Sequence, residues 1–383
     1  MATDLLRNVV DALPQGELER KLALGRPLRV KLGVDPTSAD LHLGHSVVLG
    51  KLREFQDAGH KVVLIIGDYT ARVGDPSGRS KTRPVVSGEE IDANARTYQE
   101  QAFRILRDDA ESLEVRFNSQ WLDMPTEDLF RLARVATVAQ VLERDDFAKR
   151  WSAREPISVL ELLYPLLQGY DSVAVRADVE LGGTDQKFNL LLGRDVQRAY
   201  GMPEQAVLTL PLLVGTDGHE KMSKSLGNYV GVTEAPAEQY GKTLSLPDEA
   251  MGTWYRLLLG RDPDPSAGPR DAKRALARAI VERYHGPDAA VAAEEAFDRV
   301  FVQRGVPDDM PTVAVAASDG VVHLPQVLGD AFGVSRSEAR RLIQSGGVRL
   351  DDEVVSELDV APDRLDGVVL RAGKRRFARL QVS

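Results

Sequence analysis

Short apolar runs of β-favouring residues alternate with longer segments of helical periodicity through the first half of the chain. Residues 62–66 are unbroken valine, leucine and isoleucine, as expected for a strand covered on both faces. This alternation predicts a parallel sheet wrapped by helices, with ligands at the carboxyl ends of its strands. The predicted strands comprise residues 29–34, 62–66, 114–118, 172–179 and 207–213.

Changes in composition divide the chain further. The sheet is expected within residues 1–228, with a mostly helical insertion at roughly 89–154 that could carry a dimer contact. Residues 229–306 are rich in alanine, leucine, glutamate and arginine, which predicts a small helical domain. Proline, acidic and small residues at 307–320 indicate a linker, and residues 321–383 are expected to form a third compact unit, with helices first and short strands after.

Charge and composition narrow the class of protein. The 383 residues include no cysteine, which excludes a disulfide scaffold and a thiolate-held metal. The net charge of −9 argues against a nucleic-acid binder that uses its whole surface, but a local basic patch is still allowed. We find no signal or transit peptide pattern and no apolar run long enough for a bilayer. We therefore expect a cytoplasmic protein with no membrane partner.

Two motifs carry candidate chemistry. The stretch GVDPTSADLHLGH follows the first predicted strand and opens a helix, whose N-terminal NH groups suit a phosphate. Its His42 and His45 share one face, and Gly44 lets a ligand approach the backbone closely. The pentapeptide KMSKS places Lys221 and Lys224 in a glycine-flanked loop that could close over a polyphosphate. Either motif alone is more often a surface feature, but the pair, about 180 residues apart, is far less often accidental.

Together the two motifs resemble the class I aminoacyl-tRNA synthetases and, within them, the bacterial tyrosyl-tRNA synthetases. The resemblance covers nearly the whole chain and extends to GDPSGR at 74–79, YPLLQGYDS at 164–172 and GGTDQ at 182–186, which point to tyrosine. It implies an α/β fold with a Rossmann-like parallel sheet, then a helical domain and a small α+β RNA-binding domain. It also implies ATP-dependent attachment of tyrosine to tRNA through a tyrosyl-adenylate, with ATP and Mg²⁺ as co-substrate, no tightly bound cofactor or metal site, and a homodimer.

A polar stripe on one predicted helix is the candidate tyrosine site. Tyr164, Gln168 and Asp171 fall at i, i+4 and i+7, so they share a face. Periodicity alone leaves a water-facing stripe equally open, whereas the flanking leucines favour a lined cavity. The resemblance implies that Tyr164, Gln168 and Asp75 hold the amino acid's ammonium group and that Asp171 accepts the phenol hydrogen bond. It also places Gln186 on the carboxylate and Gly33 beside the substrate.

The resemblance assigns a larger set of residues to ATP and to catalysis. The residues implied at the phosphates and ribose are Thr37, His42, His45, Asp35, Gly44, Gly183, Asp185 and Ser223. The cationic clamp over the β- and γ-phosphates would comprise Arg79, Arg83, Lys221 and Lys224. A simpler interpretation keeps Arg79 and Arg83 as solvent-exposed loop charges until ATP binds.

One position departs from the pattern. Strand alternation puts Lys31, Gly33 and Asp35 on the face that leads to the pocket. Many tyrosyl enzymes resemble this stretch but carry a tyrosine at the position of Lys31, where it shares the phenol contact. Two alternatives stay open for Lys31: it pairs with an acid at the pocket wall, or it extends outward to solvent.

The last part of the chain indicates an RNA partner. Residues 324–358 resemble the small RNA-binding fold first described in a small-subunit ribosomal protein. Arg336, Arg340 and Arg341 share a face of its helix and could contact phosphates, although a solvated helical face is the simpler interpretation without the resemblance. The second basic group is the run Lys374, Arg375 and Arg376.

Three rival functions compete with that of a tyrosyl enzyme. A tryptophanyl synthetase is disfavoured by Asp171 and by the RNA-binding segment. A small-molecule nucleotidyltransferase can share HxGH but needs no further domains, and a noncatalytic RNA-binding relative would lack some of the signature histidines and lysines. The apolar positions in residues 129–144 could form a dimer interface or simply core.

Overall fold

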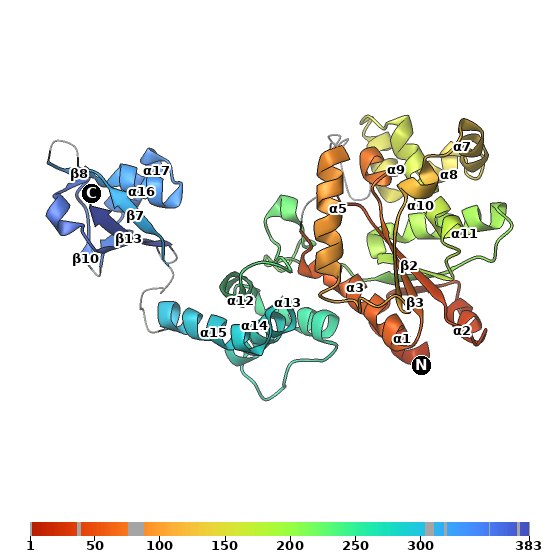
Figure 1. The fold of residues 1–383 in the computed structure, drawn as a ribbon, viewed down its shortest axis with the longest axis horizontal. Helices are drawn as coiled ribbons and strands as arrows, with labels where there is room; N and C mark the ends of the chain where they lie inside the picture. The colour runs from red at the N-terminus through yellow and green to blue at the C-terminus, as the bar shows by residue number, and fades with distance from the viewer. Residues whose placement is uncertain are drawn as a thin grey trace. The chain divides into compact units, whose positions relative to one another are not determined.

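The computed structural model describes residues 2–36, 40–75, 88–302, 310–317, 320–351, 353–373 and 376–382. They divide into two compact units, Met1–Ala293 and Glu294–Ser383. Each unit has a β-sheet and a hydrophobic core of its own (Figure 1). Among the described residues, no helix combines the length and apolar character that a membrane span requires.

The first unit is built on a six-stranded sheet with the order β1-β6-β5-β2-β3-β4. Five strands are parallel, and β1 runs antiparallel to β6 at the edge. The strands are β1 (Asp11–Leu13), β2 (Arg29–Val34), β3 (Lys61–Ile66), β4 (Leu113–Phe117), β5 (Val179–Gly183) and β6 (Ala206–Leu210). The chain order reverses between β2 and β5, and ligands of such sheets bind beside the carboxyl ends of strands at this switch point.

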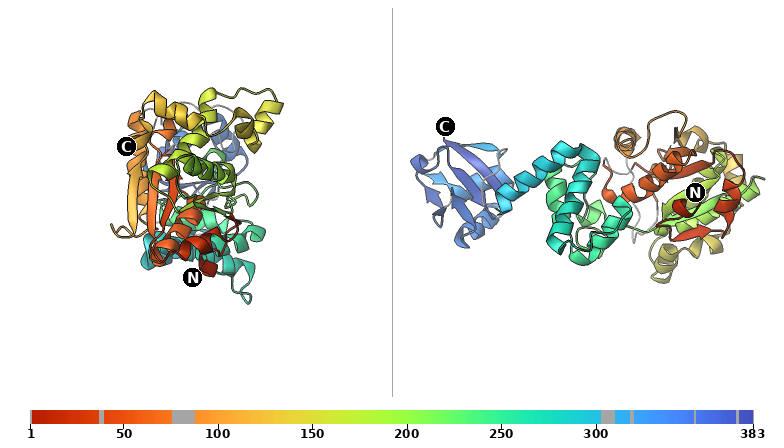
Figure 2. Two further views of the ribbon diagram at one scale, coloured as in Figure 1. Left: turned by 90° about the vertical axis from the view of Figure 1, so that its right-hand side faces the viewer. Right: turned by 90° about the horizontal axis from the view of Figure 1, so that it is seen from below.

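Both faces of the sheet are covered by helices (Figure 2). Val62, Leu64 and Ile66 of β3 pack in the main core with residues of α3 and α5, whereas Val63 and Ile65 face Val175, Ala177 and Trp121. The helices of this region are α1 (Ala2–Leu5), α2 (Glu17–Leu22), α3 (Leu43–Asp57), α4 (Thr70–Val73), α5 (Gly88–Ala102), α6 (Ser119–Leu122), α7 (Thr126–Ala133), α8 (Val138–Leu142), α9 (Asp145–Ser152), α10 (Val159–Ala174) and α11 (Lys187–Ala199). The parallel α/β prediction is confirmed.

The strand predicted at residues 172–179 is wrong. Helix α10 continues to Ala174, and β5 begins only at Val179. Alternating valines gave this stretch a strand-like pattern, but packing of α10 decides its structure, and the left-handed conformation of Arg176 (φ 52°) follows the helix end. Strand β1 was not predicted, because its three residues are too few to show the alternation of apolar and polar positions that marks a strand.

Residues 236–302 are mostly helical. The helices are α12 (Pro236–Leu244), α13 (Asp248–Trp254), α14 (Pro269–His285) and α15 (Pro287–Phe297), with π-helical turns η3 (Tyr255–Leu259) and η4 (Asp298–Val302). Helices α12 to α14 belong to the same compact unit as the sheet. The Tyr284 hydroxyl on α14 donates to Ser46 Oγ on α3 at 2.8 Å, which joins the two parts through a buried hydrogen bond.

The second unit carries a five-stranded sheet with the order β10-β9-β12-β13-β7, and β8 pairs with β11 beside it. Its elements are β7 (Thr312–Val315), β8 (Val322–His323), α16 (Leu324–Phe332), α17 (Arg336–Gln344), β9 (Val348–Leu350), β10 (Glu353–Val354), β11 (Asp359–Val360), η5 (Pro362–Arg364), β12 (Val369–Ala372) and β13 (Arg376–Val382). Thr312–Val315 falls inside the predicted linker, yet it pairs in parallel with β13. Strands β7 and β8 thus precede the helices that the sequence places first.

Candidate active site

A cavity of about 390 Å³ opens at the carboxyl ends of the parallel strands. It brings together both signature motifs and the polar stripe of α10. The residues singled out from the sequence that line it are Gly33, Asp35, His42, Gly44, His45, Asp75, Tyr164, Gln168, Asp171, Gly183, Asp185, Gln186, Lys221 and Ser223. Thr37, Arg79 and Arg83 lie outside the described residues.

The two histidines form the N-terminal cap of α3. His42 Nδ1 accepts from the Gly44 amide at 3.2 Å, and His45 Nδ1 accepts from the His42 amide at 3.2 Å. A Cβ at position 44 would lie 2.9 Å from the His42 ring, so this cap requires glycine there. Because each Nδ1 accepts a backbone hydrogen bond, the neutral rings carry their proton on Nε2.

Both histidines are held neutral. Burial, the neighbouring His45 and the Lys224 charge lower the pKa of His42 to about 2. Burial and Lys224 lower the pKa of His45 to about 4. At neutral pH the pair therefore offers two Nε2–H donors without a net charge, which is suited to hydrogen bonding with phosphate oxygens.

The polar stripe faces the cavity, so the water-facing alternative is wrong for it. Helix α10 begins at a capping box in which Ser158 Oγ accepts from the Leu160 amide and Glu161 accepts from the Ser158 amide. Leu166 and Leu167 bury the other side of the helix at 4% and 5% exposure. The polar residues of the stripe therefore face the cavity at the carboxyl ends of the strands.

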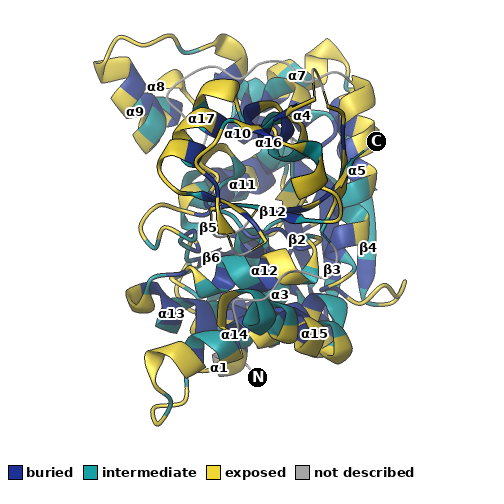
Figure 3. Ribbon diagram, turned by 90° about the vertical axis from the view of Figure 1, so that its left-hand side faces the viewer, coloured by how far each residue is buried: buried dark blue, intermediate teal, exposed yellow. Residues whose placement is uncertain are grey.

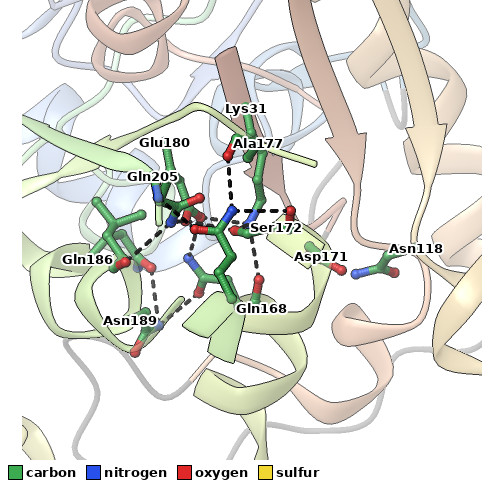
Figure 4. A network of polar contacts seen from close by, with 12 residues as sticks. Lys31, Asn118, Gln168, Asp171, Ser172, Ala177, Glu180, Gln186, Asn189 and Gln205 are labelled. Atoms are coloured by element: carbon green, nitrogen blue, oxygen red, sulfur yellow. Dashed lines mark hydrogen bonds and ion pairs between the residues drawn. The ribbon is translucent and has the colours of Figure 1, made fainter. Parts of the chain in front are cut away.

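Asp171 is the buried acid at one end of the cavity. Trp121 Nε1 donates to Asp171 Oδ1 at 2.8 Å, and the side chain of Asn118 lies next to the same carboxyl (Figure 4). Burial raises the pKa of Asp171 to about 6, a shift that the Lys31 charge and the Trp121 hydrogen bond oppose. Asp171 lines the cavity, where its carboxylate can accept a hydrogen bond from a ligand hydroxyl.

At the same cavity, hydrogen bonds join the candidate ammonium and carboxylate ligands. The Tyr164 hydroxyl donates to Asp35 Oδ2 at 2.8 Å. Burial and the Asp35 charge raise the pKa of Tyr164, which keeps it a donor. Gln186 Nε2 donates to Asp75 Oδ2 at 2.9 Å, which links the predicted carboxylate ligand to a predicted ammonium ligand.

Sequence reasoning missed two residues that hold this arrangement. Asn189 Nδ2 donates to Gln168 Oε1 at 2.8 Å and to Gln186 Oε1 at 3.3 Å. Arg144, buried in the insertion, donates to Asn189 Oδ1 at 3.0 Å, and its Nη2 lies 3.6 Å from Asp75 Oδ1. Asn189 follows Gln186 by three residues, which was the available signal, whereas nothing in the sequence distinguishes Arg144 from a surface arginine.

Lys31 pairs with an acid, as the first of its two alternatives predicts, but this acid, Glu180, does not line the cavity. Its Nζ donates to Glu180 Oε1 at 2.8 Å, to Ser172 Oγ at 2.9 Å and to the Gln168 carbonyl at 3.0 Å (Figure 4). The Lys31 side chain has 0% exposure, so the outward alternative is wrong.

Both lysines of the KMSKS loop form ion pairs with carboxylates. Lys221 Nζ lies 3.1 Å from Asp185 Oδ2, and Lys224 Nζ lies 3.5 Å from Asp40 Oδ2. Asn228, which the sequence analysis did not single out, accepts from the Ser223 amide at 2.8 Å and so braces the loop. The loop follows β6 in the chain, and its Lys221 and Ser223 line the same cavity as the histidine pair.

The candidate RNA-contacting arginines lie in the second unit. Arg336, Arg340 and Arg341 are exposed on α17, whose Ala339 and Ile343 are buried. Arg376 Nη1 lies 3.9 Å from Glu338 Oε1, which places Arg376 beside the same helix. Lys374 and Arg375 lie outside the described residues. In the part of the chain that the structure describes, no group of three or more acidic, histidine or cysteine side chains is arranged to hold a metal.

Comparison with known proteins decides the family. The family of tRNA synthetases class I (W and Y) matches residues 23–302. The chain belongs to this family. The synthetase also matches the S4 domain at residues 324–359. The resemblance seen in the motifs and the predicted fold class are thereby confirmed.

Curated relatives cover the synthetase almost completely. A tyrosine–tRNA ligase of Moorella thermoacetica is 52% identical over 98% of this chain and 94% of its own length. One of Thermotoga maritima is 50% identical over 98% of this chain and 96% of its own length.

Solved structures agree on the fold. A C-terminally truncated mitochondrial tyrosyl-tRNA synthetase of Aspergillus nidulans has a TM-score of 0.64 at 23% identity, covering 78% of the synthetase and 93% of that chain. The tyrosyl-tRNA synthetase of Archaeoglobus fulgidus complexed with L-tyrosine has a TM-score of 0.62 at 23% identity, covering 76% and 96%.

Proposed function

We propose that the synthetase attaches tyrosine to its tRNA through a tyrosyl-adenylate, releasing pyrophosphate and then AMP. The observation that carries the choice of amino acid is Asp171, a buried carboxylate with a Trp121 hydrogen bond at the end of the cavity that holds both signature motifs. A phenol hydroxyl adds a hydrogen bond to this acceptor, whereas a phenylalanine ring would exclude water from it without supplying one. The tyrosine–tRNA ligases at 50–52% identity support the same substrate.

Within this function, the tyrosine ammonium group binds to Tyr164, Gln168 and Asp75. Gln186, tied to Asp75, orients the substrate carboxylate. Gly33 lines the cavity, and a Cβ there would meet no heavy atom within 4 Å, so the glycine leaves this space to the substrate.

ATP occupies the other end of the cavity. Its ribose hydroxyls bind at Gly183 and Asp185, and its phosphates bind at the Nε2–H groups of His42 and His45. The remaining members of the ATP and catalytic set are Asp35, Thr37, Gly44, Arg79, Arg83, Lys221, Ser223 and Lys224. Mg²⁺ arrives with ATP as part of the substrate, bound mainly by phosphate oxygens.

Activation follows from positioning and charge. A tyrosine carboxylate oxygen attacks the α-phosphorus of ATP, the bond to the bridging oxygen breaks, and pyrophosphate leaves. The carboxylate is already a nucleophile, so no general base is required, which agrees with histidines that burial keeps neutral. The lysines of the KMSKS loop stabilise the negative charge that develops on the leaving pyrophosphate.

The second step brings in tRNA, whose terminal ribose hydroxyl attacks the acyl-adenylate. We assign catalysis to residues 1–228, with the helical insertion at about 89–154, and a helical anticodon-side domain to residues 229–306. Residues 307–320 lead into the RNA-binding part, 321–383, and contribute β7 to its sheet. There Arg336, Arg340, Arg341 and the basic run at 374–376 contact phosphates. Charging takes place in the cytoplasm, where translation uses the product.

The synthetase acts as a homodimer joined through the insertion. Phe130, Val138, Trp151 and Val159 lie in or beside its short helices and are 61%, 62%, 67% and 75% exposed, an unusual number of large apolar side chains for a free surface. Much of α8 and α9 is exposed in Figure 3. Leu132 and Val141 of the same stretch are core residues.

The deciding experiment is ATP/pyrophosphate exchange with tyrosine, tryptophan and phenylalanine tested separately in magnesium buffer. Exchange with tyrosine alone is expected. Exchange with tryptophan would keep the fold and overturn the role of Asp171. Absence of exchange with all three would favour a nucleotidyltransferase or a noncatalytic RNA-binding protein.

A further inference from the structure

The buried ion pair between Lys31 and Glu180 lies behind the tyrosine end of the cavity. The two residues are register partners on the adjacent parallel strands β2 and β5, at the switch point of the sheet. Their side chains are 0% and 1% exposed. Neither residue lines the cavity, whereas Gln168 and Asp171 above them do.

All three protons of the Lys31 ammonium have acceptors: Glu180 Oε1, Ser172 Oγ and the Gln168 carbonyl. A substrate phenol could accept from Lys31 only by displacing one of them. Glu180 is saturated in turn, since Oε2 accepts from Ser172 Oγ at 3.1 Å and from Gln205 Nε2. The lysine therefore acts on the substrate through α10 and not by contact.

Two of the three acceptors belong to α10 and flank Asp171 in the chain. Ser172 directly follows Asp171, and Gln168 precedes Asp171 by three residues. Lys31 therefore hydrogen-bonds to the helical turn from which the Asp171 carboxyl projects. From the other side, Trp121 fixes the carboxylate itself. The Lys31 charge also lowers the pKa of Asp171 against the effect of burial.

We propose that Lys31 is a positioning residue for amino-acid selectivity: anchored on Glu180 of β5, it holds the turn of α10 at Gln168 and Ser172 so that Asp171 meets the phenol hydroxyl. The inference rests on the proposed role of Asp171. It assigns to this chain an indirect route to tyrosine selectivity.

The test variant is Lys31→Met with Glu180→Gln, because removing one partner alone would leave a buried charge unpaired. Lys21→Met is the matched control, since Lys21 is equally buried at 2% exposure and has its own carboxylate partner, Asp178, at 3.8 Å. Lys21 does not line the cavity. Thermal melting establishes that each variant is folded.

Exchange kinetics with tyrosine and phenylalanine provide the readout. In the double variant, kcat/KM for tyrosine is expected to fall about tenfold more than kcat/KM for phenylalanine, chiefly through KM, because the hydrogen bond to the hydroxyl is lost for tyrosine alone. Lys21→Met should leave kcat/KM unchanged for both tyrosine and phenylalanine. Equal losses for both amino acids, or no loss for either, would overturn the proposal.

Combination with Asp171→Asn separates this proposal from the one on which it rests. If Lys31 acts through Asp171, the Lys31/Glu180 change causes no further loss of tyrosine selectivity in the Asp171→Asn background. Additive losses would mean that Lys31 contacts the phenol itself and would refute the positioning role. Full selectivity in Asp171→Asn alone would instead refute the Asp171 assignment.

A milder variant tests the same proposal if the double variant does not fold. Ser172→Ala removes one acceptor of Lys31 and leaves the ion pair intact. It should lower the preference for tyrosine over phenylalanine by about threefold, again through KM for tyrosine. An unchanged preference in this folded variant would count against the anchoring of α10 by Lys31.

Discussion

Lys221 and Asp185 are ion-pair partners, with Nζ 3.1 Å from Oδ2. The two belong to different motifs and, in the proposed function, to different parts of ATP. When Asp185 binds the ribose and Lys221 binds the phosphates, the ion pair separates. Each side chain then contacts ATP in place of the other side chain. Both side chains are partly exposed, at 43% and 28%, so this exchange has a low energetic cost.

Replacing Lys221 with alanine is expected to lower kcat for exchange by about 10²- to 10³-fold, because the cation acts on charge that develops in the transition state. KM for tyrosine should change little. Lys187→Ala is a matched control: Lys187 is 44% exposed and pairs with Asp11 at 2.7 Å. Stopped-flow or exchange kinetics check both variants, and a pure KM effect in Lys221→Ala would contradict a transition-state role.

The pKa of Asp171, raised to about 6 by burial, predicts a pH-dependent KM. Above that pH the carboxylate accepts the phenol hydrogen bond, and below it protonation removes the charge. KM for tyrosine should therefore be flat above pH 7 and rise by up to about tenfold per pH unit below 6. In Asp171→Asn this limb should be absent; if it persists there, another group causes it.

The histidine pair predicts the pH dependence of stability. The folded pKa of His45 lies at about 4, below the ordinary value of 6.5, mainly because the ring is buried. Between these two pH values the unfolded chain binds a proton at His45 that the folded chain does not. The contribution of His45 to the free energy of unfolding is therefore fully present above pH 6.5 and is lost as the pH falls toward 4. His45→Asn should flatten the fall of the melting temperature across this window. A fall as steep as in the parent would show that other groups cause it.

Deleting residues 310–383 removes the complete sheet of the second unit. Exchange with tyrosine should persist within about twofold, because every described residue that lines the cavity precedes residue 224. tRNA charging should fall sharply. Alanine at Arg336, Arg340 and Arg341 should reduce the slope of log affinity for tRNA against log salt by about 2. Loss of exchange together with charging would assign this unit a structural role.

The exposed apolar side chains of the insertion predict a dimer that one charge can disrupt. Phe130→Asp should shift the protein to monomers in analytical ultracentrifugation. Leu24→Asp, at an apolar side chain 49% exposed outside the insertion, should leave the dimer intact. A parent protein that is monomeric at micromolar concentration would contradict the proposed assembly.

Local spacing predicted much of the cavity, and long-range pairing accounts for what it missed. Tyr164, Gln168 and Asp171 share a face because helical geometry fixes it, and the structure places all three at the cavity. The partner of Lys31 lies 149 residues away in sequence, so periodicity left its orientation undecided. Arg144 acts on Asn189 across 45 residues, with no local pattern to mark it.

The order of strands in the second unit also has a consequence for synthesis on the ribosome. Strand β13 is translated after every other strand of its sheet, yet it lies between β12 and β7. Strand β7 therefore has no neighbour in the sheet until β13 has emerged, and the pairing of Thr312–Val315 is among the last events in folding. The first unit ends at residue 293, so it can fold and bind ATP while the RNA-binding sheet is still incomplete.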